Sequence, residues 1–293
     1  MSYIRFPPFV GHIYVPTAST RAALAGLGLY SPCRRRGLIL RFSAEWMVKR
    51  FGPAALPGRR ADAAPFSEVG DWDQIEGLLH DQLGAFDALA VHTRRLPHRP
   101  GAAMMLLLQG DPVAFVKIGT DSSIEHEHRV LTQLDRPGSS PAFEAPAPLG
   151  FQTIGETRVA VMTVLLNGRH RPIARPPLAA VVDGVQRALR HLPRPSGLPP
   201  HWRPMHGDLS PWNLRTDSAG RSVLFDWEEA GFGPPGADEV YYAATSAAVG
   251  LPRQNVAGTT GEPVAFWQAR FEKQGASRLR EAVLRELSRL DRR

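Results

Sequence analysis

The segment His206–Asn213 brings together residue types that bind metal ions and phosphates or move protons. Its sequence, HGDLSPWN, places Asp208 and Asn213 five residues apart on a stretch bent by Pro211. A second carboxylate, Asp226, stands 18 residues after Asp208, directly after an apolar run that we predict to be a strand. Mg²⁺ prefers one or two protein oxygens together with substrate phosphates and water. The two segments therefore predict a pair of loops that offer oxygen ligands to a metal ion.

Lysine is rare in this chain, since only Lys49, Lys117 and Lys273 accompany the arginines among 35 basic residues. A lysine ammonium is a compact point charge suited to phosphate oxygens, whereas arginine is a broad planar fork. Lys117 stands in the apolar run VAFVKI, a predicted strand, where a buried ammonium needs a partner. We expect that partner to be Glu127, because on the helix predicted next it shares a face with apolar residues. Glu125 is the alternative.

In chain order these residues are a strand lysine, a helix glutamate, an aspartate and an asparagine on one loop, and a further aspartate. That is the order of functional parts in the protein-kinase template. The sequence resembles the aminoglycoside phosphotransferase and choline kinase family, which has HGD where protein kinases have HRD, and Asp-x-Asp/Glu where they have DFG. The matching motifs here are His206-Gly207-Asp208 and Asp226-Trp227-Glu228. The resemblance covers roughly residues 85–293 and is best between 204 and 243.

The resemblance implies a protein-kinase-like fold, ATP and Mg²⁺ as cofactors, and transfer of the γ-phosphate to a hydroxyl of a small molecule. It implies that Asp208 accepts the proton of that hydroxyl. It also implies that Asn213 and Asp226 hold Mg²⁺, and that Asp238 steadies the catalytic region.

The resemblance further implies a nucleotide site on the strands that precede the catalytic loop. Lys117, paired to Glu127, is implied to contact the α- and β-phosphates. Met162 and Val164 are the implied adenine contacts, in a hinge that ends at Leu166. The connection PHRPGA between the first two strands carries one glycine and no G-x-G-x-x-G motif, which weakens the assignment of a loop covering the phosphates.

A nucleotide-binding pseudoenzyme or scaffold without transfer activity is therefore the alternative. A protein substrate is disfavoured, because the stretch between Asp226 and Asp238 is too short for a long peptide-docking segment. The substrate stays open among sugars, amino alcohols and antibiotic-like molecules, and so does the preference for ATP or GTP.

The apolar patterns predict an α+β protein of two lobes. We expect a partly irregular N-terminal extension of unassigned role over residues 1–84, a small antiparallel-sheet N-lobe over 85–166, and a mainly helical C-lobe over 167–293. Within these, we predict strands at 37–42, 88–96, 103–109 and 113–119, and a pair of strand-like segments in 157–166. Helices are predicted from Ser19 or Thr20 to Leu29, from Asp71, after Ser122 or Ser123, over 177–192, and twice within 262–290.

Composition and charge set further bounds. The net charge of +7 raises the question of nucleic acid, but the basic residues are scattered and the cluster Arg34-Arg35-Arg36 has no interleaved aromatics, so we expect no nucleic-acid partner. One cysteine, Cys33, allows no internal disulfide. No apolar run approaches the length that spans a bilayer, so we expect a cytoplasmic protein without a membrane partner. The oligomeric state stays open.

Overall fold

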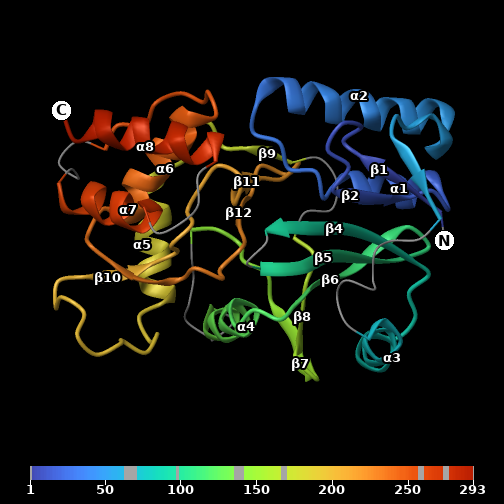
Figure 1. Cartoon of the computed structure of the whole chain (residues 1–293), viewed down its shortest axis with the longest axis horizontal. Coiled ribbons are helices and arrows are strands. Elements are labelled where there is room, and N and C mark those ends of the chain that lie inside the picture. The colour runs from blue at the N-terminus through green and yellow to red at the C-terminus, as the bar shows by residue number, and fades with distance from the viewer. Residues whose placement is uncertain are drawn as a thin grey trace. The chain divides into compact units, whose positions relative to one another are not determined.

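The computed structural model describes residues 2–62, 71–96, 99–134, 142–165, 170–256, 261–272 and 277–292. The chain divides into two compact units (Figure 1). Unit 1 comprises residues 1–128 and 146–170, and unit 2 comprises residues 129–145 and 171–293. Among the described residues, no helix is both long and apolar enough to cross a bilayer.

Unit 1 is built on an antiparallel sheet of eight strands in the order β3-β1-β2-β4-β5-β6-β8-β7. The three strands predicted at 88–96, 103–109 and 113–119 are confirmed as β4, β5 and β6. The strands are β1 (Tyr3–Phe6), β2 (Ile13–Pro16), β3 (Arg59–Ala61), β4 (Ala88–Leu96), β5 (Arg99–Leu108), β6 (Asp111–Gly119), β7 (Pro148–Ile154) and β8 (Thr157–Met162).

The predicted pair of strands in 157–166 is wrong in its second half. Only β8 forms there, and its hairpin partner β7 lies before it in the chain. Residues 163–165 are not strand, and the rest of that segment lies outside the described residues.

The helices of unit 1 are α1 (Thr20–Leu27), α2 (Arg35–Phe51) and α3 (Trp72–Leu83), with the 3₁₀ turn η1 (Pro53–Ala55) after α2. The next helix, α4 (Ser123–Leu134), begins in unit 1, and its residues from 129 on belong to unit 2. Ser19 caps α1, since its side chain accepts a hydrogen bond from the backbone N–H of Ala22. Asp71 caps α3 in the same way, through Gln74. The strand predicted at 37–42 is wrong, because those residues lie inside α2.

The reason for that error lies in how α2 packs. Leu40, Ala44 and Val48 recur every four residues and pack with Phe6 and Val15 of the sheet. A short apolar run such as GLIL cannot be distinguished from a buried helix segment by periodicity alone. The helical spacing becomes visible only over the full length of α2.

Strands from the N-terminal extension join the same sheet as the strands of the predicted N-lobe. β1 pairs with β2 and β3, and β2 pairs with β4. Helix α1 packs through Ala22 and Ala25 against Ala90 and Met105 on one face of the sheet. Gly26 permits this close approach, since a Cβ there would lie 2.8 Å from a Pro16 carbon and 3.2 Å from Ala90 Cβ. The domain boundaries themselves stay predictions.

Unit 2 is mainly helical, as predicted. Its helices are α5 (Leu178–Ala188), α6 (Ala237–Ala248), α7 (Glu262–Glu272) and α8 (Arg278–Leu290), and its short strands are β9 (Arg171–Pro172), β10 (Arg203–Met205), β11 (Leu214–Thr216), β12 (Ser222–Leu224) and β13 (Gly231–Gly233). The strands pair as β10-β13 and β12-β11-β9. The last three helices share one core, which includes Val240, Trp267 and Leu287.

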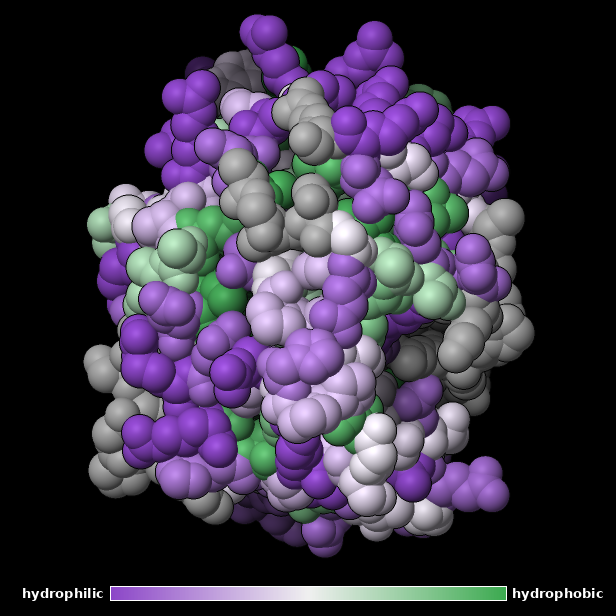
Figure 2. Space-filling view, turned by 90° about the vertical axis from the view of Figure 1, so that its left-hand side faces the viewer, coloured by the Kyte–Doolittle hydropathy of each residue, from purple (hydrophilic) through white to green (hydrophobic). Residues whose placement is uncertain are grey.

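Figure 2 shows a face on which hydrophilic residues predominate and hydrophobic residues form separate patches.

Candidate active site

The catalytic-loop candidate lies in unit 2, between β10 and β11. Its two polar side chains meet there: Asn213 Nδ2 donates to Asp208 Oδ2 at 2.8 Å and to the Asp208 carbonyl at 3.0 Å. The backbone of the loop turns at Ser210, whose carbonyl accepts from the N–H groups of Asn213 and Leu214. Because both Asn213 donor contacts go to Asp208, the Oδ1 atom of Asn213 is the one left to bind a cation.

Asp238, at the start of α6, anchors the beginning of this loop. Its carboxylate accepts from the backbone N–H of His206 at 2.8 Å and from that of Gly207 at 3.2 Å. Gly207 has φ +79°, and a Cβ there would lie 1.9 Å from the carbonyl oxygen of Glu229. Only glycine fits a left-handed position with backbone this close. The backbone of this loop therefore lies close against the segment that follows β12.

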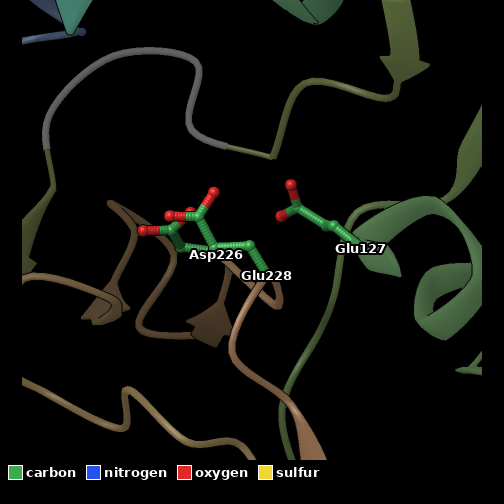
Figure 3. A group of neighbouring side chains, drawn as sticks. All are labelled: Glu127, Asp226 and Glu228. Carbon is green, nitrogen blue, oxygen red and sulfur yellow. The ribbon is translucent and has the colours of Figure 1, made fainter. Parts of the chain in front are cut away.

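Asp226 follows β12 on the second loop of unit 2. The two loops are joined, because the N–H of Phe225 donates to the carbonyl of Asn213 at 3.3 Å and β12 pairs with β11. Asp226 itself has φ +70°, an uncommon conformation for a residue with a Cβ. Such conformations concentrate at functional sites. Glu228 comes from the same loop, and Figure 3 shows both carboxylates.

The surroundings of Asp208 change the pKa of its carboxyl group. Burial and, to a smaller extent, the negative charge of Asp226 raise the pKa of Asp208, which reaches about 8. Hydrogen bonds from Tyr241, Trp212 and Asn213 act in the opposite direction. Two carboxylates on joined loops repel each other unless a cation or a proton lies between them. Their chemistry, together with the Asn213 Oδ1, therefore fits a divalent metal ion that prefers oxygen ligands.

His206 and Trp227 are packing residues of these loops. Both are fully buried, and their rings lie 4.5 Å apart between centroids. His206 Nδ1 accepts from the backbone N–H of Asp208, and Trp227 Nε1 donates to the Leu224 carbonyl. These contacts hold Asp208 and the end of β12 in place.

In unit 1, Lys117 and Glu127 form a buried ion pair. Lys117 Nζ lies 2.6 Å from Glu127 Oε2, and the two side chains are 7% and 0% exposed. The alternative partner, Glu125, instead points to Arg158 at 3.8 Å, where both side chains are partly exposed. The pairing expected from the helical face is therefore the one present, with Glu127 on α4 (Figure 3).

One face of the sheet gathers the candidate nucleotide contacts. Lys117 and Phe115 lie two residues apart on β6, so their side chains leave the same face. Phe115 pairs in register with Met162, which is buried at the end of β8. Val164 packs against the cluster that includes Met105 on that face.

Sequence reasoning missed two aromatic residues. Phe115 was overlooked, although an aromatic two residues before a strand lysine is a signal that alternation could have used. Tyr241 was missed as well, because α6 brings it to Asp208 only through tertiary packing. No local pattern around Tyr241 indicates that contact.

Comparison with known proteins identifies the family to which the sequence is similar. A sequence profile of the phosphotransferase enzyme family matches residues 55–281, which is most of the chain. No curated protein sequence matches significantly.

The solved structures that match this chain share little sequence with it. A macrolide 2'-phosphotransferase from Brachybacterium faecium has 14% identity and a TM-score of 0.45, covering 73% of this chain and 98% of that one. A putative fructosamine-3-kinase from Haemophilus somnus has 12% identity and a TM-score of 0.41, covering 77% and 98%. An aminoglycoside phosphotransferase in complex with ADP and hygromycin B has 13% identity and a TM-score of 0.43, covering 73% and 88%.

Proposed function

Because the chain belongs to the phosphotransferase enzyme family, we propose that it uses ATP and Mg²⁺ to phosphorylate a hydroxyl group of a small molecule. The observation that carries this proposal is the geometry of the two joined loops in unit 2. Asn213 is fixed by its hydrogen bonds to Asp208, and Asp226 stands at the end of the neighbouring strand in a left-handed conformation. An ordinary polar turn requires neither feature.

In this proposal Asp208 is the residue that accepts the proton of the substrate hydroxyl. Its carboxylate is oriented by Asn213, and its loop is anchored by Asp238. Phosphoryl transfer depends mainly on positioning and on electrostatic stabilisation, so a rigid carboxylate contributes by holding the hydroxyl in line. Mg²⁺, when bound by Asn213 and Asp226, supplies positive charge that offsets the phosphate charge and lowers the pKa of Asp208.

Unit 1 would hold the nucleotide. The Lys117 ammonium is kept charged and in place by Glu127, which suits it to contact the α- and β-phosphates. Met162, Val164 and Phe115 lie on the same face of the sheet and provide apolar surface for adenine. This assignment adds Phe115 to the contacts expected from the sequence.

The proposal is tested by following phosphate from γ-labelled ATP onto a panel of small hydroxyl compounds, comprising sugars, amino alcohols and antibiotics. Wild type should label at least one of them in the presence of Mg²⁺. Asp208→Asn should reduce that rate by about 10²–10⁴-fold, the range that general-base catalysis supplies. Asp183→Asn, on the exposed face of α5, is the matched control and should leave the rate unchanged. An Asp208→Asn variant that keeps the wild-type rate would refute Asp208 as the base.

The alternative is nucleotide binding without transfer. It is distinguished in the same experiment, because a pseudoenzyme would bind ATP yet label none of the compounds at any concentration of Mg²⁺.

A further inference from the structure

Helix α2 has an unusual distribution of apolar side chains. Its buried face packs Ala44 and Val48 against the sheet, as a helix of a soluble unit is expected to do. Its opposite face also carries large apolar side chains. Ile39 is 55% exposed, Phe42 38% and Trp46 59%.

These apolar residues form one stripe along the helix. Positions 39, 42 and 46 are three and four residues apart, the spacing that places side chains on one face. At the end of α2, Phe51 is 62% exposed and its ring meets that of Trp46 edge-on at 5.7 Å. Exposed apolar side chains that adjoin one another mark interaction surfaces, whereas single ones are common on any protein.

The stripe is bordered by positive charge and by no exposed carboxylate of the helix. Arg35, Arg36, Lys49 and Arg50 are all exposed. The guanidinium of Arg50 lies 5.7 Å from the centroid of the Phe51 ring. The one acidic residue between Arg35 and Phe51 is Glu45.

Glu45 does not offset the charge of the exposed face. It is buried, and its Oε1 lies 2.9 Å from Nε of the buried Arg41. The two charges of that pair therefore offset each other on the inner side of α2. The four exposed cations remain as the charge that this face presents to a partner.

We propose that the exposed face of α2 binds the surface of an anionic lipid bilayer. This face consists of Ile39, Phe42, Trp46 and the flanking basic residues, a composition typical of helices that lie in a membrane interface. In such helices apolar and aromatic side chains enter the headgroup region, and lysine and arginine contact anionic headgroups. The helix lies along the outside of β1, β2 and α1 in unit 1 (Figure 1), so no rearrangement of its core is needed to expose the stripe. This surface role differs from membrane spanning, and it revises the expectation that a membrane is not a partner.

Charge argues against two other occupants of this face. A second copy docked symmetrically through this same face would bring the same cations against one another, and α2 has no exposed carboxylate to pair with them. Nucleic acid would use the cations, but its phosphates offer no apolar environment to Ile39 and Phe42.

The test is co-sedimentation of the full chain with vesicles of phosphatidylglycerol and phosphatidylcholine, compared with vesicles of phosphatidylcholine alone. Wild type should prefer the anionic vesicles, and added salt should weaken that binding. Because the whole chain is basic, the decisive variant is Trp46→Ser, which leaves every charge in place. It should lower the vesicle affinity by about tenfold or more, since a large apolar side chain no longer enters the interface. Arg35→Gln should lower it by about fivefold.

Two matched controls accompany these variants. Leu279→Ser removes an apolar side chain of α8 that is 39% exposed, and Arg285→Gln removes an exposed charge of the same helix. Both should bind vesicles as wild type does. All four substitutions are at exposed positions, so an unchanged melting temperature shows that each variant is folded.

Two results would overturn the proposal. Equal binding of wild type and Trp46→Ser to anionic vesicles would show that diffuse positive charge alone is responsible, as for a nucleic-acid binder. Absence of a preference for anionic vesicles would exclude the lipid surface and leave an acidic protein as the partner of this face.

Discussion

The buried pair of Lys117 and Glu127 gives a quantitative test of how unit 1 holds its lysine. Replacement of Glu127 by Gln keeps the shape of the side chain and one acceptor oxygen but removes the charge. The ammonium of Lys117 then stays buried, 7% exposed, without its counter-charge. Removal of one partner from a buried ion pair lowers the free energy of unfolding by about 3–5 kcal/mol. We expect Glu127→Gln to lie near the lower end of this range, because the amide oxygen of Gln can still accept a hydrogen bond from Lys117.

The exposed pair beside it is the control. Glu125 and Arg158 are 3.8 Å apart with partly exposed side chains, so Glu125→Gln should cost only about 0–1 kcal/mol. Urea unfolding followed by fluorescence measures both losses. The double variant Lys117→Met with Glu127→Leu removes both charges, and it should be more stable than Glu127→Gln alone. The reasoning is refuted if Glu127→Gln and Glu125→Gln lose the same small amount, or if the double variant recovers nothing.

Three further predictions concern the anchoring of the loop that carries Asp208 and the packing of α1. Gly207→Ala should lower the melting temperature far more than Gly197→Ala, since both positions have positive φ but only Gly207 has a backbone oxygen within 1.9 Å of the added Cβ. Burial raises the pKa of Asp238 from 3.8 to about 7. Between pH 3.8 and about pH 7 the folded chain therefore keeps a proton on Asp238 that the unfolded chain has released, so the free energy of unfolding falls as the pH rises. Asp238→Asn should flatten this part of the curve of melting temperature against pH, and an unchanged slope would contradict the assignment. Gly26→Val should destabilise the packing of α1, whereas Gly77→Ala, in the open on α3, should stabilise the chain by about 0.5–1 kcal/mol in thermal unfolding.

The candidate site residues could be selected from the sequence where residue chemistry and local pattern coincide. Asp208, Asn213 and Asp226 stand in short segments whose residue types are unusual together, and Glu127 could be chosen over Glu125 from the helical face alone. Tyr241 could not be found in this way, because its contact to Asp208 depends on how α6 packs in unit 2. Long-range packing leaves no periodic signal in either segment.

The fold class could be predicted from the sequence, whereas the secondary structure of the N-terminal residues was predicted less well. The meander β4-β5-β6 follows from alternation and tight turns, and the helices of unit 2 follow from their apolar faces. The strand wrongly predicted at 37–42 lies in α2, where large apolar side chains occur on both faces of the helix. A helix with apolar side chains on both faces gives a weak helical periodicity in its sequence. The exposed apolar stripe of α2 therefore explains the wrong strand prediction, and it is also the basis of the proposed membrane-binding surface.

The central claim is a nucleotide and metal site that includes Asp226. Its most direct test is a thermal-shift titration of wild type and Asp226→Asn with ATP, in the presence and absence of Mg²⁺. A ligand that binds only the folded state raises the melting temperature by mass action. We predict a shift in wild type that requires Mg²⁺ together with ATP and that is lost in Asp226→Asn. A wild-type chain whose melting temperature ATP and Mg²⁺ leave unchanged, or a variant that shifts as much as wild type, would contradict the account.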